Sequence, residues 1–98
     1  MRVYWSNKAR FRLREIERHI AKDAPARARA MVARLVDRVG DLGAHPYVGR
    51  QIPEYDLAGL REVLERPYRI IDLVGDGRVD IITVKHYRQR LPDRSADL

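Results

Sequence analysis

The chain has 98 residues, of which 45% are hydrophobic and 35% charged, a composition that suits one folded domain and excludes intrinsic disorder. Its 20 lysines and arginines exceed its 14 acidic residues, and the net charge of +6 favours polyanionic partners: nucleic acid, a ribosome or an acidic protein. The lack of cysteine excludes disulfides and thiolate chemistry, and no apolar run has the length of a signal peptide or membrane span, so we expect a cytoplasmic protein with no membrane partner.

The N-terminal half predicts a strand followed by two helices. Residues 3–5 favour a strand, and Ser6 stands where a helix N-cap belongs. Apolar residues then recur at helical spacing on either side of Pro25, which ends one helix near Lys22 and opens the next. The first apolar run is Ala9, Leu13, Ile16 and Ile20, and the second is Ala28, Val32, Leu35, Val39 and Leu42. Two helices joined by so few residues predict an antiparallel hairpin.

The C-terminal half predicts strands after a long connection. Residues 43–60 hold two prolines and three glycines, which is typical of an irregular loop. Residues 60–74 predict one or two strands, because Pro67 must lie at a strand start or at an edge. Residues 75–77 predict a tight hairpin turn before the last strand, and we expect the tail from about residue 93 to residue 98 to be flexible.

This element order, β-α-α-β-β-β, predicts a single α+β domain over residues 1–98. We expect a small, twisted antiparallel sheet with the helical hairpin packed on one face. The other face and the strand ends would then be free for binding.

The end of the last strand carries the densest group of functional side chains in the sequence. The group consists of Lys85, His86, Tyr87, Arg88 and Arg90. Cations beside an aromatic ring suit RNA, because phosphates pair with Arg and Lys while bases stack on Tyr. A histidine there can act as a general acid or base near neutral pH. The alternative is a solvated strand end with the histidine packed at the edge of the core.

Two further arginines, Arg61 and Arg69, lie on the preceding strand segments. Arg69 stands in an otherwise apolar strand, which predicts a polyanionic ligand or a carboxylate partner such as Asp72 or Asp80. We expect Arg69 and residues 85–90 to form one basic surface.

The other polar residues favour structural roles. The cations of the first helix predict a solvated face, balanced by Glu15 and Glu17. The three histidines are scattered without metal-ligand spacing, and no glycine-rich loop suits a phosphate, so we expect no metal and no cofactor.

Taken together, the segments resemble the RelE/ParE superfamily of toxins from type II toxin–antitoxin systems. The resemblance covers about residues 2–92 and rests on "VYWSNKA", "LGAHPYVGR", "LREVLERPYRII" and "VDIITVKH". It implies a growth-inhibiting toxin in a hetero-oligomer with a cognate antitoxin, which we expect to be acidic and to fold on binding. We expect the antitoxin to bind the sheet edge and the apolar side of the hairpin.

Members of this superfamily differ in target, and "HPYVGR" and "LREVLERPYRI" look closer to ParE, whose members inhibit DNA gyrase without an active site. For such a toxin the residues predicted to contact the target or a polyanion are Arg61, Arg69, Lys85, Arg88 and Arg90. The sequence departs from the usual superfamily pattern at Asp72 and Leu73, where a second aromatic residue and a cation are common. A carboxylate facing an RNA path would repel phosphate.

The alternative is a RelE-like nuclease that cuts messenger RNA on the ribosome. The resemblance then implies that Arg69 and Lys85 stabilise the phosphate charge. His86 would act as general acid or base, and Tyr87 would stack or donate a proton. A third possibility is a degenerate, non-toxic member that acts only as an antitoxin or DNA partner.

Overall fold

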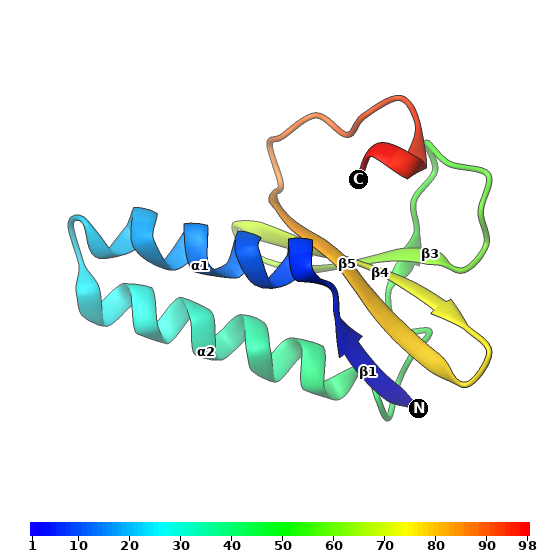
Figure 1. The fold of residues 1–98 in the computed structure, drawn as a ribbon, viewed down its shortest axis with the longest axis horizontal. Helices are drawn as coiled ribbons and strands as arrows, with labels where there is room; N and C mark the ends of the chain where they lie inside the picture. The colour runs from blue at the N-terminus through cyan, green and yellow to red at the C-terminus, as the bar shows by residue number, and fades with distance from the viewer.

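A computed structural model describes residues 1–98 and contains two α-helices packed on one five-stranded sheet (Figure 1). The elements are β1 (Arg2–Trp5), α1 (Asn7–Ala21), α2 (Pro25–Asp41), β2 (Arg50–Gln51), β3 (Leu60–Glu65), β4 (Tyr68–Gly75), β5 (Arg78–His86) and the 3₁₀ turn η1 (Ser95–Asp97). The α+β class and the helical hairpin predicted from the sequence are confirmed. Neither α-helix has the length and apolar character needed to cross a membrane.

The hairpin begins and turns at the residues that the sequence marks. The Ser6 hydroxyl caps α1 by accepting a hydrogen bond from the Ala9 N–H at 2.9 Å, and it donates one to the Ile82 carbonyl at 2.9 Å. Pro25 lies in the first turn of α2, where its missing N–H and fixed φ are compatible with a helix. The chain therefore leaves the sheet at Ser6 and reverses before Pro25, which places the two apolar stripes over the sheet.

The sheet has the strand order β1-β5-β4-β3-β2. Strands β2 to β5 pair antiparallel, whereas β1 pairs parallel with β5 in the register Arg2↔Arg78 to Trp5↔Ile81. The sheet is thus mixed, because the edge strand β1 and its neighbour β5 run in the same direction. Strand β2 was not predicted, since its two residues lie inside the irregular connection.

Alternate residues of the central strands supply two separate cores. The core beneath the helices includes Ile70 and Ile81, and the core on the opposite face includes Ile71. Leu91 and Leu98 of the C-terminal segment pack into this second core, and the Tyr55 hydroxyl donates to the Pro92 carbonyl at 2.5 Å.

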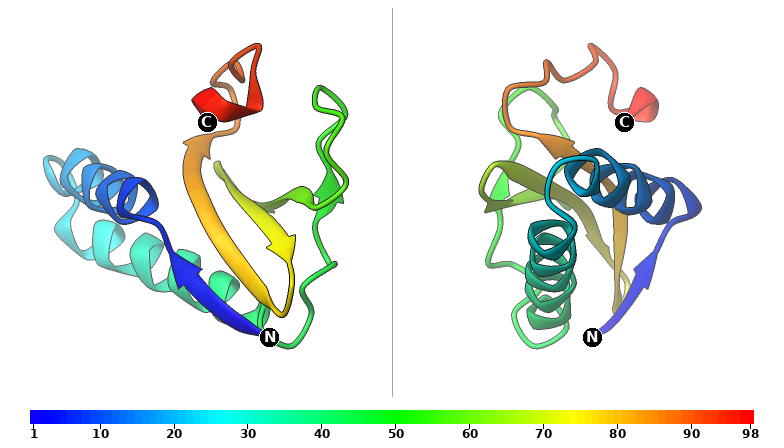
Figure 2. Two further views of the ribbon diagram at one scale, coloured as in Figure 1. Left: turned by 45° about the vertical axis from the view of Figure 1, so that its right-hand side comes forward. Right: turned by 90° about the vertical axis from the view of Figure 1, so that its left-hand side faces the viewer.

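The C-terminal segment corrects two of our expectations. Figures 1 and 2 show it beside the connection that leads into β3. The predicted flexible tail is therefore packed, and it covers part of the sheet face that we expected to be free. The physical reason is that two leucines in the tail find apolar partners which the helices leave uncovered.

Candidate target-binding surface

The predicted site residues on β4 and β5 lie on opposite faces of the sheet. Arg69 is opposite Lys85 in the β4–β5 register, and Tyr68 is opposite His86. The His86 ring meets the Tyr68 ring edge-on, with centroids 5.7 Å apart, on the face that carries the helices. Because side chains alternate along a strand, Lys85 and Arg69 share the other face. The structure thus brings Lys85 to Arg69 and separates both from His86.

The last residue of β5 and the two residues after it form a compact aromatic–cation group, which we define as His86, Tyr87 and Arg88. The Tyr87 ring stacks on His86 with centroids 5.0 Å apart, and the Arg88 guanidinium lies 5.5 Å from the Tyr87 ring centroid. The Arg88 N–H donates to His86 Nδ1 at 3.1 Å, so a neutral His86 carries its proton on Nε2. Tyr87 remains 46% exposed, which leaves an aromatic face and a cation available to a partner.

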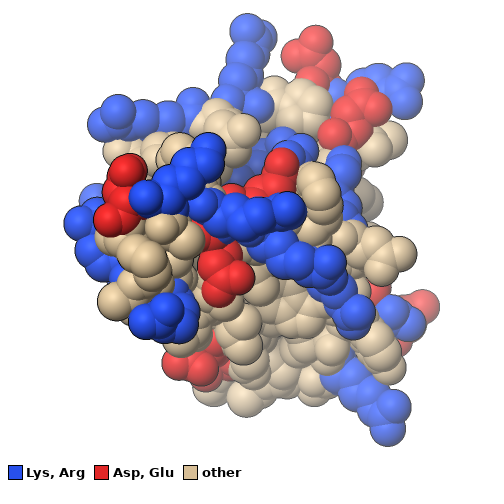
Figure 3. Space-filling view, turned by 60° about the vertical axis from the view of Figure 1, so that its left-hand side comes forward, with Lys and Arg blue, Asp and Glu red and all other residues tan.

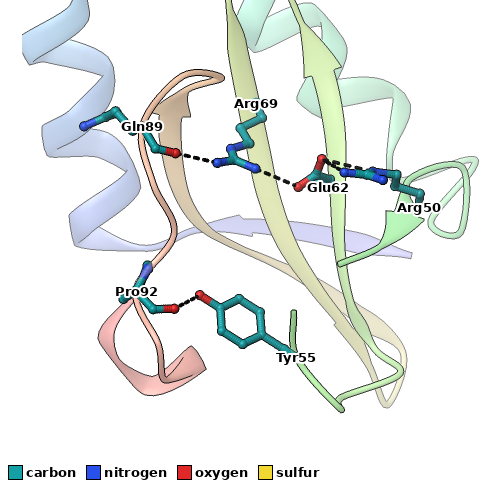
Figure 4. Close-up of polar contacts among 6 residues, drawn as sticks. All are labelled: Arg50, Tyr55, Glu62, Arg69, Gln89 and Pro92. Atoms are coloured by element: carbon teal, nitrogen blue, oxygen red, sulfur yellow. Dashed lines mark hydrogen bonds and ion pairs between the residues drawn. The ribbon is translucent and has the colours of Figure 1, made fainter. Parts of the chain in front are cut away.

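Arg69 is engaged within the protein by a carboxylate, which is one of the two alternatives that its place in an apolar strand predicted (Figure 4). Its guanidinium lies 3.4 Å from a Glu62 carboxylate oxygen and donates to the Gln89 carbonyl at 2.6 Å. The side chains of Arg69 and Glu62 are only 11% and 3% exposed, and Arg50 approaches the same carboxylate at 3.0 Å. The carboxylate partner is thus Glu62 rather than Asp72 or Asp80, and the predicted basic surface is smaller than expected.

Arg61 does not join this surface, because it lies on the helix-facing side of β3. Its guanidinium donates to the Gly49 carbonyl at 2.9 Å and lies 5.1 Å from the centre of the Tyr47 ring. Its direct neighbour across the β3–β4 ladder is Asp72. The predicted polyanion-binding residues Arg61 and Arg69 therefore point to different sides of the sheet.

Asp72 is fully buried, and neither of its carboxylate oxygens has a hydrogen-bond partner. Burial raises the pKa of Asp72 from 3.8 to about 7, against the opposing effect of the Arg61 charge. Our argument that an exposed carboxylate here would repel RNA does not apply to this side chain. The Asp72 carboxylate instead belongs to the core beneath the helices.

Lys85 is half-buried and forms no hydrogen bond or ion pair with the protein. Burial lowers its pKa most, and the charges of Arg12, Lys8 and Arg69 lower it further. The sequence predicts a solvated helix face for Lys8 and Arg12, and Arg12 pairs with Glu15 at 2.8 Å. Their four-residue spacing puts both cations on one side of α1, and this spacing is the feature of the sequence from which their common position could have been predicted.

A groove of about 750 Å³ lies between the free end of the helical hairpin and the end of the sheet. Its apolar lining includes Ile16, Ile20, Met31 and Tyr68, and its cations include Arg27. Figure 3 views the molecule with the hairpin side brought forward and shows Lys and Arg forming a broad band with fewer acidic groups between them. The groove therefore combines an apolar floor with a mainly cationic rim.

Comparisons with known proteins agree with this architecture. Residues 3–91 match the family described as the ParE toxin of the type II toxin–antitoxin system parDE. The chain is 35% identical over 96 residues to "Putative toxin Y4kP" of Sinorhizobium fredii, an alignment that covers 93% of each protein.

Three solved structures are similar. A chain of the chromosomal ParDE TA system from P. aeruginosa has a TM-score of 0.75 and 26% identity, over 88% of this chain and 95% of that one. A chain of the toxin–antitoxin complex RelBE2 from Mycobacterium tuberculosis has a TM-score of 0.63 and 26% identity, over 87% and 95%. The YoeB dimer of Staphylococcus aureus, at 14% identity and a TM-score of 0.59 over 88% and 95%, supports the fold alone.

The fold and these similarities define a type II toxin of the RelE/ParE superfamily. Within that superfamily, the chain belongs to the ParE toxin family.

Proposed function

We propose that this ParE-family toxin inhibits growth by binding DNA gyrase, and that it acts through surface contact rather than catalysis. The observation that supports this choice is the separation of the candidate catalytic residues. Arg69 and Lys85 lie on one face of the sheet, and His86 lies on the other. General acid–base cleavage requires groups within reach of one reacting centre, whereas a protein contact does not.

The contact surface in this proposal is the aromatic–cation group together with Arg90. Tyrosine and arginine are the residues most often found at energetic centres of protein interfaces. Tyr87 is exposed and already held by His86 and Arg88, so little side-chain entropy would be lost on binding. The target lies in the cytoplasm, and the proposal places the toxin there.

A DNA supercoiling assay with purified gyrase and antitoxin-free toxin tests the proposal. We expect loss of supercoiling, and we expect Tyr87→Ala to weaken the inhibition about tenfold or more, as hot-spot truncations do. Phe11→Ala is the matched control, because Phe11 is an exposed aromatic residue of α1 with 51% exposure. Supercoiling that is unaffected by folded toxin at micromolar concentration would contradict the proposal.

The second candidate is ribosome-dependent cleavage of messenger RNA. It is favoured by the similarity to a chain of the RelBE2 complex and by the burial of Asp72, which removes one repulsive charge from the surface. In this case Arg69, Lys85, His86 and Tyr87 are the residues to replace. Loss of a catalytic group costs about 10²- to 10⁴-fold in rate. Alanine variants of all four that retain toxicity would exclude this candidate.

The proposal also includes neutralisation by a cognate antitoxin, since two of the similar solved chains come from a ParDE TA system and a RelBE2 toxin–antitoxin complex. An acidic amphipathic segment of the antitoxin would fill the groove at the hairpin end, with further contacts at the β3 edge. The apolar side chains of this antitoxin segment would pack against Met31 and the apolar residues beside it in the groove. The carboxylates of the segment would pair with the unpaired Arg27 on the rim.

Antitoxin binding to two α2 variants tests this location. Met31→Glu places a charge inside the groove and should weaken antitoxin binding about 100-fold, because an unpaired charge would be buried in the complex. Val36→Glu makes the same change at a residue that is 44% exposed and outside the groove lining, so affinity should change little. Equal losses for the two variants would place the antitoxin elsewhere.

A further inference from the structure

Lys85 presents a free amine where the end of β5 meets the start of α1. Strand β1 pairs only with residues Arg78–Ile81, so the end of β5 has no strand beside it on this edge. Helix α1 begins against this edge instead, because the Ser6 N–H donates to the Ile81 carbonyl at 3.0 Å. The Lys85 side chain is half-buried there, yet its amine keeps contact with solvent and forms no hydrogen bond or ion pair with the protein.

The charges around this amine are mainly positive. Lys8 and Arg12 come from the first turns of α1, and Arg69 lies on β4 directly across the ladder. Each of these three cations has its own partner in the protein. Arg12 pairs with Glu15 at 2.8 Å, and Lys8 donates to a main-chain carbonyl of the C-terminal segment. Arg69 pairs with Glu62 at 3.4 Å, so the amine between the three cations is the one that is left without a partner.

These surroundings favour the neutral, nucleophilic form of the Lys85 amine. A lysine attacks an electrophile only when it is deprotonated, and a desolvated lysine beside other cations gives up its proton more easily than an exposed one. Burial lowers the pKa of Lys85 most, and the charges of Arg12, Lys8 and Arg69 lower it further. Because the amine has no partner, no contact within the protein has to break before it reacts.

The other two lysines of the chain lack this combination of access and environment. The Lys8 amine is engaged by the Leu98 carbonyl. Lys22 is exposed at the far end of α1 beside the exposed Asp23, so water solvates its charge. Lys85 is therefore the lysine whose position is best suited to covalent modification.

We propose that Lys85 is a modification site, at which an acyl phosphate transfers its acyl group to the amine. The nitrogen lone pair attacks the acyl carbon, the bond from this carbon to the phosphate oxygen breaks, and phosphate leaves with the electron pair. The nitrogen then releases one proton to water, and the product is a neutral amide. An acyl phosphate is favoured over a neutral acyl donor, because the positive field around the amine attracts its phosphate group and stabilises the leaving anion.

The modification would remove the one unpaired cation of this cluster, directly before the aromatic–cation group in the chain. It would leave the ion pairs of Arg12 and Arg69 in place. This site goes beyond the proposed contact with gyrase, and neither gyrase nor an antitoxin is needed to test it.

Incubation of the folded protein with acetyl phosphate, followed by mass spectrometry, tests the proposal. Cleavage after arginine places each lysine in its own peptide, namely residues 3–10, 19–27 and 79–88. In the folded protein Lys85 should be acetylated at least about threefold faster than Lys22, and the rate at Lys85 should level off at a lower pH. In concentrated urea, where the fold is lost, the two lysines should react at similar rates.

Arg12→Gln tests the cause of the reactivity. The variant removes one of the charges that act on Lys85 and releases Glu15, so it should slow acetylation of Lys85 about twofold or more and leave Lys22 unchanged. Arg14→Gln is the matched control, because Arg14 is an exposed cation of the same helix that does not act on Lys85. Equal melting temperatures for the two variants would show that the difference in rate does not come from loss of the fold.

Three results would overturn the proposal. The first is equal acetylation of Lys85 and Lys22 in the folded protein. The second is the same preference for Lys85 in urea, which would assign it to the local sequence rather than to the folded site. The third is an equal preference with the neutral donor p-nitrophenyl acetate, which would remove the role of the phosphate group. Each result leaves the gyrase assay untouched, so failure of this site and failure of the proposed function are distinguishable.

Discussion

The Asp72 carboxylate should make the stability of the fold depend on pH, and Asp72→Asn should remove that dependence. In the folded protein burial raises the pKa of Asp72 to about 7, whereas its ordinary value is 3.8. The folded state therefore retains a proton that the unfolded chain has lost between about pH 4 and pH 7. The free-energy cost of burying the ionised carboxylate is absent below about pH 4, grows between about pH 4 and pH 7, and is complete above about pH 7. At about 1.4 kcal/mol per pKa unit, the loss of unfolding free energy reaches at most about 4 kcal/mol.

Urea unfolding of the wild type and of Asp72→Asn at pH values from about 4 to about 8 measures this effect. The two proteins should have similar unfolding free energies near pH 4, and the variant should be more stable by a few kcal/mol near pH 8. Asp76→Asn, in the exposed turn between β4 and β5, is the control and should follow the wild type throughout. Parallel curves for the wild type and Asp72→Asn across the whole range would refute the assignment of a protonated, buried Asp72.

Three further predictions concern contacts that hold the candidate surface in place. Glu62→Gln should destabilise the fold by about 3 kcal/mol, because it leaves Arg69 buried without its carboxylate, whereas Asp80→Asn at the exposed Arg78 pair should cost less than about 1 kcal/mol. Urea unfolding of both variants compares these costs, and equal values would contradict the buried pair. Ser6→Ala should cost about 1 to 2 kcal/mol, since it removes both the α1 cap and the bond to Ile82; an unchanged melting temperature would contradict this role. Tyr55→Phe should cost about 1 kcal/mol and speed amide exchange in residues 93–98, and exchange as slow as in the wild type would show that Leu91 and Leu98 hold the tail without Tyr55.

The helices could be predicted because their signals are local. Ser6, Pro25 and the apolar spacing act within a few residues, and each fixes a start, an end or a buried face. The parallel pairing of β1 with β5 joins segments more than 70 residues apart, and nothing within either segment specifies it. The packing of the tail depends in the same way on a second core that exists only when the sheet has formed.

The candidate site was predictable in composition but not in geometry. The dense cationic and aromatic end of β5 was evident from the sequence, and its Tyr87 is indeed exposed. The faces of Arg61 and Arg69 were not evident, because Pro67 separates their strands and the sequence does not fix the register across that turn. Lys8 and Arg12 were assigned to solvent because a helix wheel shows only which residues share a side, not what lies beside them.

Arg69 illustrates why a cation at a position typical of a nuclease does not by itself indicate an RNA site. Glu62 and the Gln89 carbonyl engage two nitrogens of its guanidinium, and the side chain is 11% exposed. An incoming phosphate would have to compete with a buried carboxylate and a backbone carbonyl, and releasing Arg69 would leave Glu62 with only the exposed Arg50. Lys85, directly across the ladder, has no such partner and would lose nothing by binding an anion. Among the neighbouring cations Lys85 is therefore the one without a partner, because Lys8 donates to the Leu98 carbonyl and Arg12 pairs with Glu15.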